Sequence, residues 1–225
     1  MHTKSKTSAK DIIIFVLMGC TAVLITASGI YYKQNFLRIL PLYVSLVIAL
    51  LQSRVNRYAS MLGSVNSLLY GAVYFYYNLY GSALSAIFFS CPIQVLTFIR
   101  WNKHKSGNST VLRKMTPKQM ILISTGFIAA LVIMWFVLPL FGSEYVFLDS
   151  VSTLLGILIY FLTMFAFVEY PFFMIINGII GIALHFTMLE ETPEIMPFLI
   201  FSVYSFICIV FAFFEARKLY KTQQQ

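Results

Sequence analysis

Apolar segments of about 20 residues recur along almost the whole chain, separated by short polar stretches. A helix needs about 20 consecutive apolar residues to cross a hydrocarbon core of about 30 Å. Each segment therefore predicts a transmembrane helix, and the pattern as a whole predicts an all-α membrane protein. The predicted helices cover residues 11–30, 36–53, 58–77, 82–101, 118–141, 147–167, 170–188 and 195–215. A polar loop over 102–116 follows the fourth helix.

The composition supports a protein that crosses the membrane several times. Of the 225 residues, 60% are hydrophobic and 11% are charged, with a mean hydropathy of +0.83. Soluble domains have about half apolar and about a quarter charged residues. The apolar run 12–30 is too long for a signal-peptide core, and no small-residue cleavage site follows it, so we interpret it as a retained first helix.

The charges predict the orientation. With the N-terminus in the cytoplasm, 14 of the 16 Lys and Arg residues lie on the cytoplasmic side, and six of them fall between Arg100 and Lys118. Lys33 and Arg38 alone lie outside. Basic residues favour the cytoplasmic side of membrane proteins. We therefore expect a multi-pass protein of the plasma membrane, with both termini cytoplasmic. The net charge of +8 reflects this bias and does not indicate nucleic-acid binding.

No pattern of residues indicates catalysis. Cys20, Cys91 and Cys208 lie in separate apolar segments, without the spacing of metal ligands. The chain has no nucleophile elbow, HExxH motif, P-loop pattern or pair of carboxylates within the apolar segments. The sequence predicts a protein that is not an enzyme and has neither a metal site nor a cofactor.

Two asparagines, Asn66 and Asn177, lie in the middle of predicted transmembrane helices. A buried amide in lipid must find partners, and aromatic rings on the same helical face would line a cavity with it. Steps of four, seven or eight residues from the two asparagines reach Tyr70, Tyr74, Phe173 and Tyr170. With Gln94, these residues are our candidates for binding a substrate.

Asn66 and Asn177 also suggest an internal repeat with an offset of 111 residues. The offset places three helices of the first half over three helices of the second half in the same orientation, as in transporters built from parallel repeats. The predicted parts are an N-terminal tail and extra helix (1–35), a first three-helix bundle (36–101), a basic loop and linker helix (102–141), a second three-helix bundle (142–215) and a cytoplasmic tail (216–225).

Each candidate also has a structural interpretation. Asparagine and glutamine in membrane helices often hold helices together by hydrogen bonds worth about 1 kcal/mol. Gln94 could instead satisfy backbone groups that Pro92 leaves free. Pro92 and Pro171 are candidate bending points for gating. Glu169 could complement the dipole of the following helix or form a charged gate.

Several short motifs occur in the order found in one transporter family. The first half carries Asn66-Ser67-Leu68-Leu69-Tyr70, Leu79-Tyr80-Gly81, Pro92-Ile93-Gln94, Trp101-Asn102-Lys103 and Arg113-Lys114-Met115-Thr116. The second half carries Leu148-Asp149, Ser152-Thr153 and Ile175-Ile176-Asn177. Over residues 40–215 this order resembles the PnuC family of bacterial vitamin transporters.

The resemblance implies a fold of two three-helix bundles joined by a linker helix, similar to that of the SWEET sugar carriers. It also implies facilitated diffusion of a vitamin precursor, most often nicotinamide riboside, which is trapped by cytoplasmic phosphorylation. Family members form trimers, so the expected partners are the small-molecule vitamin, membrane lipids and two further copies of the chain.

The chain departs from the family pattern beside the second asparagine. Nicotinamide riboside carriers usually have tryptophan four and seven residues before it, where this chain has Phe173 and Tyr170. Thiamine, a deoxynucleoside or another flat heterocycle is therefore an alternative cargo. A membrane scaffold or sensor that transports nothing is the alternative from another functional class.

Overall fold

The structure is a computed structural model that describes residues 9–76, 86–137, 146–190 and 192–225. Long helices occupy the predicted apolar segments. In chain order the elements are α1 (Ala9–Tyr31), α2 (Phe36–Gln52), α3 (Tyr58–Tyr76), a π-helical turn (Ala86–Ser90), α5 (Cys91–Lys103), β1 (Lys105–Ser106), β2 (Ser109–Thr110), α6 (Pro117–Val137), α7 (Val146–Met164), α8 (Tyr170–Met188), a 3₁₀ turn (Pro193–Ile195) and α9 (Met196–Gln223).

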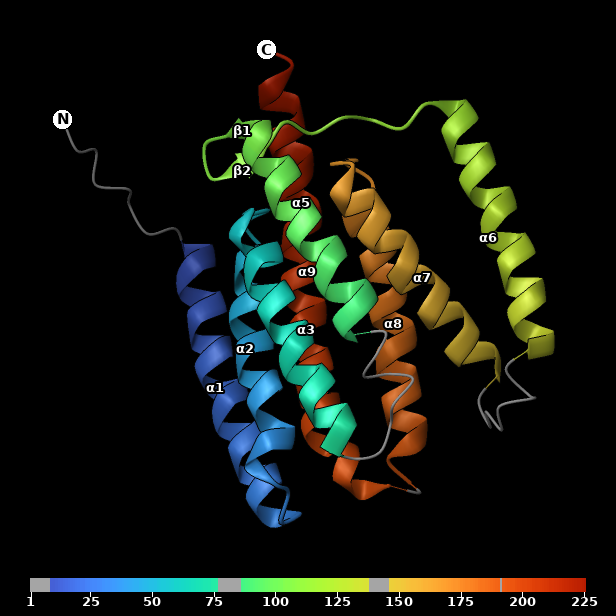
Figure 1. Cartoon of the computed structure of the whole chain (residues 1–225). Coiled ribbons are helices and arrows are strands. Elements are labelled where there is room, and N and C mark those ends of the chain that lie inside the picture. The colour runs from blue at the N-terminus through green and yellow to red at the C-terminus, as the bar shows by residue number, and fades with distance from the viewer. Residues whose placement is uncertain (1–8, 77–85, 138–145, 191) are drawn as a thin grey trace.

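Six of these helices close into a ring. In the first triplet α3 packs between α2 and α5, and in the second triplet α8 packs between α7 and α9. Contacts of α5 with α7, and of α9 with α2, join the two triplets (Figure 1). The two triplets have the same orientation. In each, the middle helix (α3 or α8) points opposite to the other two helices, and the outer helices of both triplets point the same way. This arrangement confirms the predicted pair of parallel three-helix bundles.

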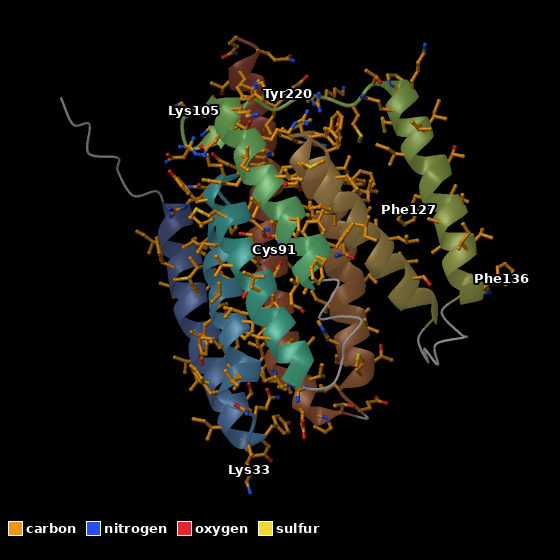
Figure 2. The ribbon with its side chains drawn as sticks, in the orientation of Figure 1. Lys33, Cys91, Lys105, Phe127, Phe136 and Tyr220 are labelled. Atoms are coloured by element: carbon orange, nitrogen blue, oxygen red, sulfur yellow. The ribbon has the colours of Figure 1, made fainter. Side chains whose placement is uncertain are left out.

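The ends of the bundle differ in chemistry. Lys105 and Tyr220 lie at the end where α1 begins and α9 finishes, and Lys33 lies at the other end (Figure 2). We call the first the basic end, because Arg100 and Arg113 also belong to the segments found there. Among the described residues, α1, α8 and the segment Pro193–Gln223 are each long and apolar enough to cross a membrane.

Two described helices lie outside the ring. α1 packs on α2 and α9, where Ile14 and Ile25 are fully buried in a cluster with Leu42 and Cys208. α6 packs on α7 and stands apart from the rest of the bundle (Figure 1). These positions agree with an extra first helix and a linker helix between the two triplets.

The predicted end of α7 was wrong by three residues. α7 ends at Met164 because Ala166 adopts a left-handed conformation (φ 57°), which an L-residue cannot continue as a helix. The next residue, Phe167, forms a parallel β-bridge with Arg113 from the loop before α6. The predicted polar loop is thus partly ordered, and it also contains the β1–β2 hairpin.

The predicted end of α9, near residue 215, was also wrong, because the helix continues to Gln223. Ala216 in this extension is fully buried. Gln223 donates from Nε2 to the Thr110 carbonyl at 2.9 Å and accepts from the Leu112 N–H at 2.9 Å. The segment predicted as a tail is therefore a helical extension bonded to the loop that follows β2.

A second hydrophobic cluster closes the basic end of the ring. It contains Val55, Trp101, Leu112, Met115, Leu162, Ala166, Phe167, Tyr170 and Ala216. The indole Nε1 of Trp101 on α5 donates to the Thr163 carbonyl on α7 at 2.7 Å. This hydrogen bond joins the two triplets directly, so the first and second halves are held together at this end by both apolar and polar contacts.

Candidate functional site

Two adjoining cavities lie inside the ring. The central cavity, about 380 Å³, is lined by Gln52, Gly156, Ile159, Tyr160, Met174, Asn177, Gly178, Gly181, His185, Phe201, Ser202, Ser205 and Ile209. The inner cavity, about 60 Å³, is lined by Gln52, Val55, Asn56, Ala59, Ser60, Gln94, Thr97, Trp101, Ile159, Tyr160, Thr163, Tyr170 and Met174. Four residues line both, so the cavities form one path toward the basic end.

The walls of this path combine neutral polar groups with aromatic rings. Amides come from Gln52 and Asn177, hydroxyls from Tyr160 and Ser205, and a further ring from Phe201. None of the described residues that line the two cavities is Lys, Arg, Asp or Glu. Such a wall suits a flat heterocycle that stacks on rings and exchanges hydrogen bonds through amide and hydroxyl groups.

Three of the predicted binding residues line this path. Asn177 of α8 lines the central cavity, and Gln94 and Tyr170 line the inner cavity. Tyr170 is almost fully buried and lies edge-on to Trp101, with the ring centroids 6.3 Å apart. The structure thus brings together residues from α5 and α8, one in each triplet.

Other predicted residues lie elsewhere. Phe173 packs against Phe172, with the centroids 5.6 Å apart, and against the cluster at the basic end. Tyr70 is a half-buried residue of α3 that lines neither cavity. Tyr74 belongs to α3, but its side chain lies outside the described residues. Their contact with a substrate stays a prediction.

Asn66 lies in the contact between α2 and α3. Its Nδ2 donates to Ser45 Oγ at 2.8 Å, and its Oδ1 is buried without a partner among the described residues. The amide therefore holds two helices together, as the structural interpretation of the sequence expected. Asn66 does not belong to the lining of either cavity, so a site that it shares with Asn177 stays a prediction.

Gln94 is fixed by its neighbours on α3. Its Nε2 donates to Ser67 Oγ at 2.7 Å, and its amide oxygen lies where a Cβ at Gly63 would be. Gly63 thus gives the Gln94 amide the room to reach Ser67. The same side chain then forms part of the inner cavity wall.

The 111-residue offset explains why the central cavity lies against the second triplet. Ser45 pairs with Asn66 in the first triplet, and the equivalent pair is Gly156 and Asn177. Ser67 pairs with Gln94, and the equivalent pair is Gly178 and Ser205. All four second-half residues line the central cavity.

The 111-residue offset relates a third pair of positions. Tyr70 of α3 corresponds to Gly181 of α8, which also lines the central cavity. At Gly156 and Gly181 an added Cβ would meet no atom within 4 Å. Gly156 and Gly181 therefore leave open the space that side chains fill in the first triplet, whereas Gly178 packs closely against Phe206.

The predicted gating residues occupy the starts of helices. Pro171 lies in the first turn of α8 and is fully buried. Pro92 lies in the first turn of α5, directly after the π-helical turn Ala86–Ser90. Proline is favoured in a first turn because its missing N–H has no helical partner there. A role of either proline in bending or gating stays a prediction.

Glu169 precedes α8, but its side chain does not cap that helix. Its carboxylate accepts from the Met115 N–H, with both oxygens within 3.4 Å. The carboxylate therefore ties the loop before α6 to the start of α8. This contact gives Glu169 a structural function, and its action as a gate stays a prediction.

Sequence reasoning missed several residues of the path, among them Gln52, Tyr160 and Trp101. Gln52 is the last residue of α2 and falls within the predicted helix 36–53, where it was not singled out. Tyr160 and Trp101 were hard to distinguish from ordinary packing residues without knowing which helix faces meet. Ser202 and Ser205 lie three residues apart on α9, and Ser202 Oγ lies 2.9 Å from His185 Nδ1. The three-residue spacing places Ser202 and Ser205 on one helical face, and this feature of the sequence could have indicated them.

A protein-family model describing the nicotinamide mononucleotide transporter matches residues 35–218. This chain belongs to that family. The match spans both triplets and the linker helix, so it confirms the resemblance to the PnuC transporters. Membership of this family, together with helices long and apolar enough to cross a membrane, identifies the protein as a membrane transporter.

A solved structure confirms the fold of this family member. It is the crystal structure of the vitamin B3 transporter PnuC, which matches with a TM-score of 0.78 at 18% sequence identity. The alignment covers 96% of this chain and 94% of that chain. No curated protein sequence matches significantly.

We expect Gly63→Ala to destabilise the protein, because the new methyl group would displace the Gln94 amide and break its hydrogen bond to Ser67. The expected cost is about 1–2 kcal/mol. Thermal unfolding of the purified protein measures it.

Gly126→Ala on α6 is the matched control, since a Cβ there meets nothing within 4 Å. Equal melting temperatures for the two variants would contradict the packing of Gln94 against Gly63.

Proposed function

We propose that the protein carries nicotinamide riboside across the bacterial plasma membrane by facilitated diffusion. The observation that carries this proposal is the central cavity, which is lined by amides, hydroxyls and aromatic rings and lies within a ring of six helices. A membrane scaffold or sensor would need no such cavity. Membership of a transporter family supports the same class of function.

The chemistry of the walls favours the riboside over the mononucleotide named in the family description. A phosphate monoester carries about −1.5 to −2 charges at neutral pH. Sites for such groups use Arg, Lys or clustered backbone N–H donors. The described walls carry neither Arg nor Lys. A cargo without phosphate avoids burying an unpaired dianion.

The aromatic residues of the path suit a cationic ring. Nicotinamide riboside carries a pyridinium, and the faces of Tyr, Trp and Phe attract cations. Tyr160 lies where the two cavities adjoin, and Trp101 and Tyr170 follow it toward the basic end. We propose that these rings, with Asn177 and Gln94, bind the cargo and that its ribose bonds to Ser205 and Gln52.

We propose a passive mechanism, which the lack of carboxylates among the described lining residues supports. Many ion-coupled carriers use intramembrane carboxylates or histidines to hold a proton or a coupling ion. Among the described lining residues, His185 is the one ionisable side chain other than tyrosine, and its Nδ1 lies 2.9 Å from Ser202 Oγ. We propose that cytoplasmic phosphorylation of the riboside maintains the inward gradient.

The distribution of basic residues supports cytoplasmic termini. The basic end carries the hairpin Lys105–Thr110, the loop with Arg113 and the end of α9.

We also propose that the protein forms a homotrimer, because members of the family that it resembles form trimers. Chemical cross-linking in membranes is the direct measure of that assembly.

Replacing Asn177 with Ala is expected to reduce uptake of radiolabelled nicotinamide riboside roughly ten-fold, because one hydrogen bond in a low-dielectric cavity is worth about 1–2 kcal/mol. Asn102→Ala, at an exposed position of α5, is the control and should transport normally.

A protonophore tests the passive mechanism. Uptake that collapses with the protonophore while the cytoplasmic kinase is not limiting would rule out passive diffusion.

Gly156→Ser tests the origin of the cavity. The added hydroxyl should reach Asn177 as Ser45 reaches Asn66, so the protein should fold and keep its melting temperature while uptake falls at least about five-fold. Gly126→Ser on α6 should leave uptake unchanged. Normal uptake by a stable Gly156→Ser variant would place the substrate elsewhere.

A panel of ligands identifies the cargo. Only a compound that binds the native protein should raise its melting temperature. We expect nicotinamide riboside to do so at lower concentration than nicotinamide mononucleotide, thiamine or a deoxynucleoside. Stabilisation by thiamine or by a deoxynucleoside alone would instead favour the alternative cargo that Phe173 and Tyr170 suggested.

A further inference from the structure

A basic pocket lies at the basic end, beside the path inside the ring, and Trp101 lines both this pocket and the inner cavity. It encloses about 220 Å³, and its walls include Arg100, His104, Thr110, Arg113 and Phe165. Arg100 comes from the last turn of α5, and Arg113 comes from the loop between β2 and α6. Two guanidinium groups and one imidazole thus share a pocket that would hold a single small anion.

The two arginines lie on one phenyl ring. The guanidinium carbons of Arg100 and Arg113 are 4.5 Å and 5.6 Å from the centroid of Phe165. Within the described part of the chain neither arginine has a carboxylate partner. Partial burial, and then the like charge of Arg100, lower the pKa of Arg113. An anion between the two groups would relieve this repulsion.

Arg113 is held in place by the backbone. Its Nε donates to the Phe165 carbonyl at 2.7 Å, and its N–H donates to the Ala166 carbonyl at 3.0 Å. Its own carbonyl accepts from the Val168 N–H at 2.9 Å. The guanidinium therefore needs little ordering when a ligand arrives, which favours tight binding.

A large apolar cavity adjoins the basic pocket. It encloses about 480 Å³ between α6 and α7, and Arg113 and Phe165 line both spaces. The rest of its wall includes Leu122, Phe127, Leu158 and Phe161. Phe127 projects from α6 toward α7, whereas Phe136 projects away from the bundle (Figure 2). The cavity lies along the apolar segments Pro117–Ile133 of α6 and Leu154–Met164 of α7.

We propose that the basic pocket and this cavity form one binding site for an anionic phospholipid. The phosphate lies between Arg100 and Arg113, and an acyl chain lies between α6 and α7. Arginine binds phosphate through paired N–H donors. An apolar cavity that begins at these donors matches a molecule with a phosphate at one end and a hydrocarbon chain at the other.

Charge and position select a lipid over other occupants. The basic end carries most of the basic residues, which places it at the cytoplasmic leaflet, where anionic lipids attract Lys and Arg. A soluble phosphate compound would leave the apolar cavity unfilled. A second copy of this chain would have to supply both an anion and an apolar segment at the same place.

The test compares lipids and charge variants of the full-length protein. Native mass spectrometry should show preferred binding of phosphatidylglycerol over phosphatidylcholine with the same acyl chains. Arg100→Gln with Arg113→Gln should lower phosphatidylglycerol affinity at least about ten-fold, since each basic contact is worth about 1 kcal/mol. Lys103→Gln with Lys105→Gln removes the same charge from exposed positions and should retain the preference.

A second pair of variants tests the apolar part without touching a charge. Ala130 lines the cavity, so Ala130→Phe should block the acyl chain and weaken lipid binding by a similar factor. Ala129→Phe, at the exposed neighbouring position, should not. A folded Ala130→Phe variant with normal lipid binding would overturn the proposal.

The remaining outcomes also overturn it. Competition by glycerol phosphate as effective as that by phosphatidylglycerol would show that a soluble phosphate is the ligand. Loss of oligomers in Ala130→Phe, with lipid binding retained, would show that another copy fills the cavity. Equal binding of both lipids by the parent protein would show that the arginines do not select the ligand.

Discussion

The path inside the ring depends on the partners that the intramembrane amides find in each triplet. In the first triplet, Asn66 bonds Ser45 and Gln94 bonds Ser67, so polar side chains fill the contacts between helices. In the second triplet, Gly156 and Gly178 stand at the positions of the two serines, and the space beside Asn177 is a cavity of about 380 Å³. Buried amides need partners. The first triplet bonds both of its amides to neighbouring helices, although Gln94 also lines the inner cavity, whereas Asn177 of the second triplet lines the central cavity.

The rest of the fold keeps this path between two halves that are joined at the basic end. Trp101 bonds Thr163 across the triplets, Glu169 accepts from Met115, and Gln223 bonds the segment between β2 and α6. These contacts use backbone groups of loops and helix ends, which would otherwise lack partners at a membrane surface. The apolar cluster around Trp101 and Tyr170 fills the space beneath them.

Two chemically different cavities therefore coexist in one chain. The path inside the ring has neutral amides, hydroxyls and rings, which suits a heterocycle without phosphate. The site between α6 and α7 joins arginines to an apolar cavity, which suits a phospholipid. Helix α7 lies between them, since Tyr160 lines the path and Phe161 lines the apolar cavity. The linker helix α6 covers the far side of the apolar cavity. Because it contacts the ring through α7, a lipid beside α6 would also contact a wall of the second triplet.

The sequence by itself determined the membrane helices, their alternating directions and the family, because helix length, charge bias and motif order are local properties. It also selected Asn177, Gln94 and Tyr170, which the structure places on one path. Only the tertiary structure decided that Asn66 pairs with Ser45, that Phe173 packs on Phe172, and that α9 continues to Gln223. A helical face can be read from spacing, but the neighbour that fills it depends on how the helices pack.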